Sequence, residues 1–359
     1  MFRPSLRTNL SLTLLAVFSI ILFIIIGLSK GADYAEQKNA AERMERSIEK
    51  VSLEFRELLK ENKVSWDKKT DPKQLGLVGP ETSPIITSRA VLSEKQRAIN
   101  PNLAAVFVKW LKEAELEAGD YVAVGVTGSS PAVNIALYSA MKELDLKPVI
   151  ITALSSSRYG ASDVNFTWLD MEKAIYSETG FKSYAASRGG NRDIAAGMNS
   201  EGKELLGDII DQNNLQLIEG NRARIVMFEK ALPKGQEYKA FINIGASVGN
   251  VGSVVSAGLL KEGVNYTLPE LEAYGVLEYF TEKNIPTIHF FRGQDTFDEY
   301  YLSEANSESQ KIGKGNVYGY SWTVALICLI LLIIAIALVI IYDRHDRHFM
   351  ANIVGHRED

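Results

Sequence analysis

The chain has 359 residues, of which 46% are hydrophobic, so it can bury a core and is not disordered as a whole. Its formal net charge of -5 and its pI near 5.6 exclude the broad basic surface of a nucleic-acid-binding protein. The single cysteine, Cys328, allows no disulfide within the chain, and His289 is the only histidine before the last fifteen residues. We therefore expect no metal site and no nucleic-acid partner.

Two charge-free segments, residues 10–28 and 322–342, predict a two-pass membrane protein. At about 1.5 Å per residue, each helix would span the hydrocarbon core of a bilayer, which is about 30 Å thick. Neither segment carries an Asp, Glu, Lys, Arg or His residue. A transporter or channel usually needs such residues at the midplane, so we expect a tethered domain rather than a conduit.

The flanking charges predict the orientation of the two helices. Arg3 and Arg7 precede the first, and Arg344 and Arg347 follow the second, whereas Lys30 is the one opposing charge. The positive-inside rule then places both termini in the cytoplasm. The alternative for residues 10–28 is a cleaved signal peptide, but this segment is longer than the usual apolar region and lacks a clear cleavage site.

These features divide the chain into expected segments. In chain order they are a cytoplasmic N-terminus (1–9), a first transmembrane helix (10–28), a helical stalk (29–62), a loop-rich connector (63–100), an extracytoplasmic α/β domain (101–300), a linker (301–321), a second transmembrane helix (322–342) and a cytoplasmic tail (343–359).

The expected stalk has a narrow apolar seam. Met44, Ile48, Val51, Phe55 and Leu58 follow one another at steps of four, three, four and three residues, which predicts one helix face. The seam of residues 33–62 could pair with a second copy in a coiled coil, giving a homo-oligomer, or it could pack on the domain of its own chain. The sequence leaves both open, because two heptads are too few to decide.

The main domain alternates between short apolar runs and helical patterns. Strands are expected at 121–126, 148–154, 215–218, 240–244 and 287–291, and helices at 101–117, 132–144, 171–179, 200–212, 221–231, 250–261 and 268–282. Buried strands between helices predict an open, mostly parallel, Rossmann-like sheet with helices on both faces. Ligands bind to such sheets beyond the carboxyl ends of the strands.

The loop after the first expected strand is a candidate anion site. Thr127, Gly128, Ser129 and Ser130 lead into Pro131, which suits the first turn of a helix. The free amide groups and the dipole of that helix favour a phosphate or a carboxylate. The alternative is a plain helix cap.

Further candidates follow the later strands. Serines and an arginine after the second strand form a possible carboxylate clamp. A glycine-flanked loop carries two more arginines, a small-residue loop follows the fourth strand, and one arginine follows the fifth. These residues are Ser155, Ser156 and Arg158, then Arg188 and Arg192, then Ser247, Gly249 and Asn250, and finally Arg292. The glycine spacing in the fourth loop is not a nucleotide-binding fingerprint, so we expect no cofactor. The loops after the first and fourth strands could face one crevice.

Two residues are weaker candidates for catalysis. His289 lies within the fifth expected strand, where a lone histidine is usually a satisfied core residue. Asp170 stands three residues after Thr167, a pattern typical of a capping box. Glu172 is two residues further on, and residues so spaced do not face each other on a helix, so a carboxylate pair is not expected.

Several strings together resemble the poly-gamma-glutamate system protein family. They are Gly79-Pro80-Glu81-x-Ser83-Pro84, Asn100-Pro101, the stretches 119–125 and 128–134, and Phe166-Thr167-Trp168-Leu169-Asp170-Met171-Glu172. These are bacterial membrane proteins associated with the poly-gamma-glutamate synthase, an ATP-dependent amide ligase that works with a polytopic membrane partner. The resemblance implies a place in the bacterial inner or plasma membrane and an accessory role in synthesis or export. It implies the polymer and the synthase subunits as partners, and no catalytic residue.

Charge constrains how such a domain would bind a polyanion. Residues 31–320 carry 33 Lys and Arg against 40 Asp and Glu, a net charge of -7. The average field repels the polymer, so binding it or another carboxylate-rich ligand requires a local cationic crevice. Arg158, Arg188, Arg192 and Arg292 are the candidates to build one.

Two other functions remain open from the sequence. One is a hydrolase or transferase acting on gamma-glutamyl bonds, with Ser129 and Ser130 as nucleophiles and His289 and Asp170 as their partners. The other is a domain that binds a small anion such as a sugar phosphate, which the hydroxyl-rich loops suggest.

Overall fold

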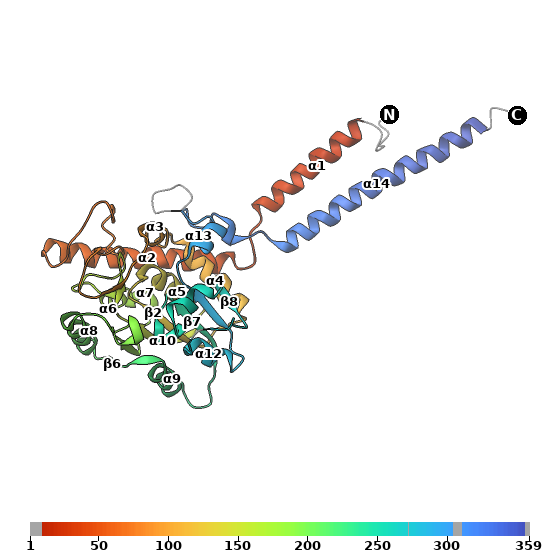
Figure 1. Ribbon diagram of the computed structural model, residues 1–359. Coiled ribbons are helices and arrows are strands. Elements are labelled where there is room, and N and C mark those ends of the chain that lie inside the picture. Colours follow the sequence, from red (N-terminus) through yellow and green to blue (C-terminus); the bar gives the residue numbers. More distant parts are fainter. Residues whose placement is uncertain (1–8, 272, 304–310, 356–359) are drawn as a thin grey trace. The chain divides into compact units, whose positions relative to one another are not determined.

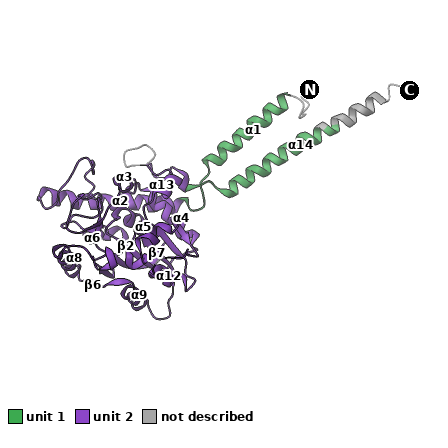
Figure 2. Cartoon of the chain, viewed as in Figure 1, with its two compact units in different colours: residues 1–34, 318–359 green, residues 35–317 purple. Residues whose placement is uncertain are grey.

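The computed structural model describes residues 9–271, 273–303 and 311–355. The chain divides into two compact units, Met1–Tyr34 with Tyr318–Asp359 and Ala35–Val317, which we treat separately (Figure 2). Most of the expected cytoplasmic N-terminus, the middle of the expected linker and the last four residues of the expected tail, including His356, lie outside the described residues.

The first unit holds two long apolar helices, α1 (Asn9–Leu28) and α14 (Trp322–Gly355). Asn9–Leu28 and Trp322–Tyr342 are each long and apolar enough to cross a membrane, which confirms that the chain has two candidate spans. Where α1 ends and α14 begins, the backbone amide of Ser321 donates to Ser29 Oγ over 3.1 Å. The rings of Tyr34 and Tyr318 also meet there, with centroids 5.5 Å apart.

The second unit is built on a seven-stranded sheet in the order β6-β5-β3-β2-β7-β9-β8 within the described residues. Its strands are β2 (Tyr121–Thr127), β3 (Lys147–Ala153), β5 (Ala185–Ser187), β6 (Gln216–Leu217), β7 (Tyr238–Ile244), β8 (Gly263–Asn265) and β9 (Thr287–Phe290). Neighbours pair in parallel except β8, which runs antiparallel to β9. The expectation of a mostly parallel α/β sheet is confirmed.

Helices cover both faces of this sheet (Figure 1). On one face Phe241 of β7 stacks on Phe280 of α12, with ring centroids 5.0 Å apart. On the other, Phe290 of β9 meets Phe107 of α4 at 5.9 Å. Phe241 is paired with Thr287 of β9, so these two side chains lie on the same face of the sheet. Side chains alternate between faces along a strand, and Phe290 is three residues after Thr287. The rings of Phe241 and Phe290 therefore point to opposite faces.

The helices of this unit and its short 3₁₀ turns connect the strands. They are α2 (Tyr34–Lys60), α3 (Leu92–Arg97), α4 (Asn102–Glu113), α5 (Pro131–Glu143), α6 (Trp168–Ala174), α7 (Tyr176–Thr179), α8 (Ser200–Gln212), α9 (Gly220–Ala231), α10 (Val248–Val251), α11 (Val254–Leu259), α12 (Val276–Thr281), α13 (Gln294–Glu299), η1 (Asn191–Asp193) and η3 (Asn316–Tyr318). The helix expected at 268–282 is shorter than predicted, since α12 is the only helix that the described residues of this range form.

The apolar seam of α2 is buried within the second unit. Met44 and Val51 are fully buried, and the ring of Phe55 meets that of Phe166 with centroids 5.7 Å apart. Of the two arrangements that the sequence leaves open, the structure shows the seam packed on the domain of its own chain. The segment expected as a stalk therefore belongs to the core of the domain.

The expected connector is also ordered against the domain. Its strand β1 (Ile86–Ser88) pairs in parallel with β4 (Ser156–Ser157), just beyond the end of β3. Upstream, the Asp71 carboxylate accepts backbone hydrogen bonds from Leu75 and Gly76, at 3.0 and 2.7 Å. The pairing of β1 with β4 carries the following residues, 89–97, to the carboxyl edge of the sheet.

The strand order reverses between β2 and β7. From β2 the chain proceeds outward through β3, β5 and β6 on one side, and it then returns to β7 and β9 on the other. The loops that leave β2 and β7 therefore diverge at the carboxyl ends of two adjacent strands. In open α/β sheets this point forms the ligand crevice.

Candidate functional site

A cavity of about 450 Å³ opens at this point of the second unit. The loops after β2 and β7, whose common crevice the sequence predicts, both line it, together with residues of β1, α3 and the loop after β9. Its volume lies in the usual range for small-molecule sites, about 300–1,000 Å³. It is the natural candidate for a ligand site.

The loop after β2 presents the start of α5 to the cavity. Ser130 occupies the N-cap position, but in the described structure its hydroxyl makes no capping hydrogen bond. Pro131 has no amide hydrogen, and the amides of Ala132 and Val133 lie in the first turn, where a helix offers no acceptor. All four residues line the cavity. This helix start therefore points uncapped donors at the space where a ligand would sit.

Close packing holds the β2 loop in place. A Cβ at Gly128 would lie 2.4 Å from the carbonyl oxygen of Leu154, so only glycine fits there. The Thr127 side chain accepts from the amide of Ser129 at 3.0 Å, and its carbonyl accepts from the Asn134 side chain at 2.9 Å. The loop is thus rigid and is not a free surface turn.

The loop after β7 lies against the β2 loop. A Cβ at Gly245, whose φ is 83°, would lie 3.1 Å from the Thr127 side chain. Ser247 follows, 5% exposed, and lines the cavity. Within the part of the chain that the structure describes, its hydroxyl has no hydrogen-bond partner. A buried polar group without a partner is costly, so this hydroxyl is available to a ligand in the cavity.

Three cationic side chains line the cavity: Arg89, Lys95 and Arg292. The ammonium of Lys95 donates to the carbonyl oxygen of Ser129 at 2.6 Å. Burial lowers the pKa of Lys95 to about 8, and the nearby carboxylate of Glu94 only partly opposes that shift. Burial in turn raises the pKa of Glu94, against the attraction of Arg292 and Lys95. Cations outnumber the carboxylate, so the cavity favours anions.

Three of the four arginines expected to build a cationic crevice lie elsewhere. Arg158 pairs with Glu81 at 2.9 Å on the surface, and Arg188 pairs with Glu219 at 2.9 Å. Arg192 is exposed within η1. Only Arg292 reaches the cavity, where Arg89 and Lys95 take the place of the others. Sequence patterns miss these two, because only the long-range pairing of β1 with β4 brings them to the sheet edge.

The remaining serine and glycine candidates divide between the cavity and the core. Ser155 lines the cavity, as does Ser157. Ser156 does not, since its buried hydroxyl donates to the carbonyl of Gly128 at 3.1 Å. Gly249 lies against a buried arginine, because a Cβ there would be 2.4 Å from Arg224 Nε.

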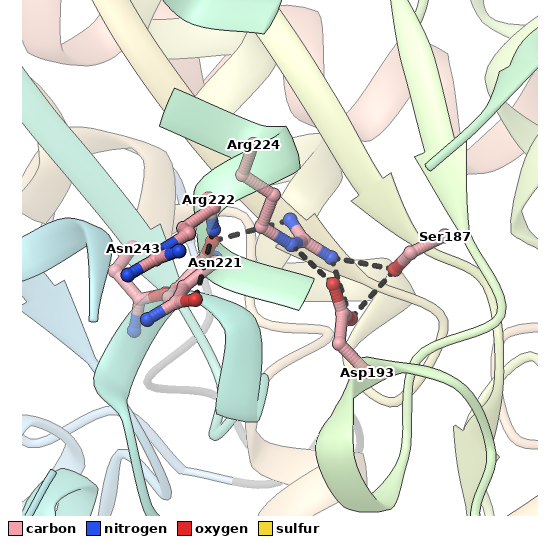
Figure 3. Close-up of polar contacts among 7 residues, drawn as sticks. Ser187, Asp193, Asn221, Arg222, Arg224 and Asn243 are labelled. Carbon is pink, nitrogen blue, oxygen red and sulfur yellow. Dashed lines mark hydrogen bonds and ion pairs between the residues drawn. The ribbon is translucent and has the colours of Figure 1, made fainter. Parts of the chain in front are cut away.

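That arginine is the centre of a buried polar network, which the sequence does not reveal (Figure 3). Arg224 and Asp193 are almost fully buried, and their side chains pair at 2.7 Å. The same guanidinium donates to Ser187 Oγ at 2.6 Å and to Asn250 Oδ1 at 3.1 Å. Asn250 in turn donates to Asn243 at 2.9 Å. Asn250, a sequence candidate for ligand binding, is therefore part of the protein's interior.

His289 ends the same network. Its Nε2 lies 3.1 Å from the carbonyl oxygen of Ala257, and its Nδ1 lies 2.9 Å from the Asn243 amide nitrogen. A carbonyl only accepts, so Nε2 carries the proton and Nδ1 accepts from Asn243. Burial lowers the pKa of His289 to about 4, so the ring is neutral at physiological pH. The ring is not among the groups that line the cavity.

The two carboxylates of the 166–172 string serve the fold. Asp170 accepts from the backbone amide of Thr167 at 2.7 Å, which completes the expected capping box of α6. Glu172 is buried and accepts from Tyr138 Oη at 2.6 Å and from the amide of Ser183 at 2.8 Å. Neither carboxylate lines the cavity, and they do not face each other as an acid–base pair.

Among the described residues, no group of three or more His, Cys, Asp or Glu side chains could hold a metal ion. The chain matches no protein-family model, no curated protein and no solved structure. The structure thus defines an α/β domain with an anion-favouring cavity, in a chain with two helices able to span a membrane. Its function is inferred from that cavity and those helices.

Proposed function

We propose that this protein is a membrane-anchored accessory component of a poly-gamma-glutamate synthesis and export system. Its α/β domain would lie outside the cytoplasm and bind the polymer or another carboxylate-rich ligand. The observation that carries the proposal is the cavity at the strand-order reversal, which combines Arg89, Lys95 and Arg292 with uncapped helix amides. The resemblance of the sequence to the poly-gamma-glutamate system protein family indicates the pathway. The order of the strands is compatible with a Rossmann-like domain.

The size and charge of the cavity favour one end of the polymer. The -7 net charge of residues 31–320 repels the body of a polyanion. A cavity of about 450 Å³ takes a small ligand or a chain end, and its cations would neutralise the few carboxylates that enter. A domain of this kind would hold or guide the growing or released end beside the synthase.

The test is polymer output in a bacterial host that carries the amide ligase and its membrane partner. Poly-gamma-glutamate is measured separately in the cells and in the medium, with and without this protein. We expect loss of exported polymer without the protein and with Arg292→Gln. Arg158→Gln, which alters an arginine outside the cavity, is the matched control and retains output. Unchanged synthesis, length and export without the protein would contradict the proposal.

The proposed orientation has its own test. The one native cysteine, Cys328, is buried within a candidate span, so a cysteine introduced at the exposed Lys50 of α2 reports on the second unit. We expect a membrane-impermeant maleimide to label the cysteine of Lys50→Cys in intact cells from which any outer barrier has been removed. Labelling only after lysis would place the domain in the cytoplasm and contradict an extracytoplasmic role.

One observation favours a second candidate, a hydrolase or transferase acting on gamma-glutamyl bonds. Lys95 titrates near pH 8 and contacts the loop of Ser129 and Ser130, so its neutral amine is suited to accept a proton from a hydroxyl nucleophile. Release of glutamate from gamma-glutamyl oligomers by the full chain, lost in Ser129→Ala or Ser130→Ala, would support it. If the wild-type chain releases no glutamate, the enzymatic candidate is contradicted and ligand binding is the role that is left.

A further inference from the structure

The ammonium of Lys95, a part-buried residue, lies in the cavity with unused donor capacity. An ammonium has three N–H donors, and the structure shows one acceptor for it among the described residues, the carbonyl oxygen of Ser129 at 2.6 Å. The Glu94 carboxylate partly offsets the cost of taking this charge out of water, and an anion placed beside the ammonium would offset more of it. Lys95 therefore keeps donors that a ligand can use.

Two further donor groups line the same cavity. The first turn of α5, a helix of 13 residues, offers the amides of Ala132 and Val133, and the Ser130 side chain does not cap them. The hydroxyl of Ser247 is 5% exposed as a residue and has no partner in the described part of the chain. A helix start alone would not define a site, but the unpartnered hydroxyl is an independent sign of a ligand.

The chain brings these groups to one place. Lys95 contacts the carbonyl of Ser129, which is three residues before Ala132, the first amide donor of α5. The loop that bears Ser247 contacts the β2 loop, since a Cβ at Gly245 would touch Thr127. The α5 amides, the Lys95 ammonium and the Ser247 hydroxyl can each donate a hydrogen bond. The helix start and the ammonium also carry positive charge. An acceptor with negative charge matches such a set best.

Other charged groups around the cavity do not fill the role. Glu262 is held by the backbone amides of Phe291, Arg292 and Gly293, at 3.1, 3.0 and 2.6 Å. Glu94 lies next to Lys95 on α3 and offsets its charge only in part, since burial raises the pKa of the Glu94 carboxyl. Arg292 and Arg89 add positive charge to the lining.

We propose that the start of α5, Lys95 and Ser247 form an oxyanion subsite that takes one carboxylate or phosphate group of the ligand. Under the proposed function, on which this assignment of the ligand rests, the group is a terminal carboxylate of a gamma-glutamyl chain. The rest of the ligand then extends toward Arg89 and Arg292. The same subsite would hold a phosphate if the ligand were a sugar phosphate.

The test is isothermal titration of the full chain in detergent with three probes: inorganic phosphate, N-acetylglutamate and a gamma-glutamyl tripeptide. Lys95→Met removes the charge and keeps an apolar stem of similar length. We expect at least about tenfold weaker binding of every probe that the wild-type chain binds, the usual effect of losing a charged hydrogen bond. Ser247→Ala should weaken binding about three- to tenfold. Lys142→Met, at the exposed opposite end of α5, is the control and should bind as the wild type does.

The pH profile separates a direct contact from a structural role. Lys95 is half neutral near pH 8 in the free protein, and a bound anion raises its pKa. Affinity should therefore fall up to about tenfold per pH unit above pH 8, and Lys95→Arg should abolish that fall. Thermal unfolding of Lys95→Met should show only a small loss of stability, because the part-buried side chain makes one hydrogen bond among the described residues.

The outcomes distinguish the subsite from the proposed function. Phosphate binding that depends on Lys95, with no binding of the tripeptide, would keep the subsite and reject the gamma-glutamyl ligand. Tripeptide binding that Lys95→Met and Ser247→Ala leave unchanged would keep the ligand and overturn the subsite. No binding of any probe by the wild-type chain would overturn both.

Discussion

Two polar clusters lie at the carboxyl edge of one sheet, and they differ in how fully their hydrogen-bonding groups are used. In the Arg224 cluster, the guanidinium donates to Asp193, Ser187 and Asn250, and the chain of contacts ends at His289. In the cavity, the start of α5, Lys95 and Ser247 retain donors without acceptors among the described residues.

This difference indicates which cluster serves the fold and which serves a ligand. A fully paired buried network fixes loops in one arrangement, and here it holds the 188–197 loop, in which Arg192, Asp193 and Ala195 all have positive φ. A cluster with unused donors is unfavourable on its own, and a ligand with acceptors relieves it. Residue type alone would not separate the two, since both contain serine and a cation.

The largest effect should come from breaking the network. Asp193→Asn keeps a side chain that tolerates the local φ of 63° but removes the charge that Arg224 pairs with. We expect a loss of about 3–5 kcal/mol in the free energy of unfolding, because a buried arginine is left uncompensated. Denaturant unfolding of the full chain in detergent measures it. Glu219→Gln, which removes the exposed partner of Arg188, should cost under about 1 kcal/mol. Equal effects of the two substitutions would refute the structural role.

The acid sensitivity of the network should trace to His289. Its pKa is about 4 in the folded chain, below the ordinary value of 6.5, so the unfolded chain binds more protons between these values. The stability that its neutral ring contributes is complete above pH 6.5 and is lost as the pH falls toward 4. His289→Gln keeps an acceptor and a donor but does not titrate.

Thermal unfolding from pH 7 to pH 4 compares the two chains. The wild type should lose on the order of 2–3 kcal/mol more than His289→Gln over this range. Parallel pH profiles would show that the ring is accessible to protons in the folded chain and is not the satisfied core residue described here.

A smaller effect should follow from crowding the β2 loop. Gly128→Ala places a Cβ 2.4 Å from the Leu154 carbonyl oxygen, so the loop has to shift. We expect a loss of about 1–2 kcal/mol in stability and weaker ligand binding, measured by thermal unfolding and titration. Gly258→Ala in α11 is the control, because the nearest atom to its Cβ is 4.0 Å away. If both variants bind ligand like the wild type, the position of the β2 loop does not govern the site.

The smallest effect should be that of Arg158. It pairs with Glu81 at 2.9 Å on the surface and does not line the cavity. Arg158→Gln should change the affinity for a gamma-glutamyl tripeptide by less than about twofold, measured by titration at physiological ionic strength. A tenfold loss of affinity would indicate that the polymer binds at the surface arginines and not in the cavity.

The sequence predicts the central strands and the loops at their ends, because continuous apolar runs such as 121–126 and 148–154 mark buried parallel strands. It misses β5, whose residues Ala185–Ser187 have little strand preference and pair only because β3 and β6 flank them. It also misses Lys95 and the pairing of Arg224 with Asp193. Both depend on contacts between residues far apart in the chain, about which local patterns say nothing.

Hydrogen–deuterium exchange of the full chain in detergent, with and without a gamma-glutamyl tripeptide, tests the central claim most directly. We expect the tripeptide to slow exchange in the segments 89–97, 129–133 and 245–248, which contribute residues to the cavity lining, and to leave the network around Arg224 unchanged. Slower exchange confined to other surfaces, or no change anywhere while the tripeptide binds, would contradict a ligand site in this cavity.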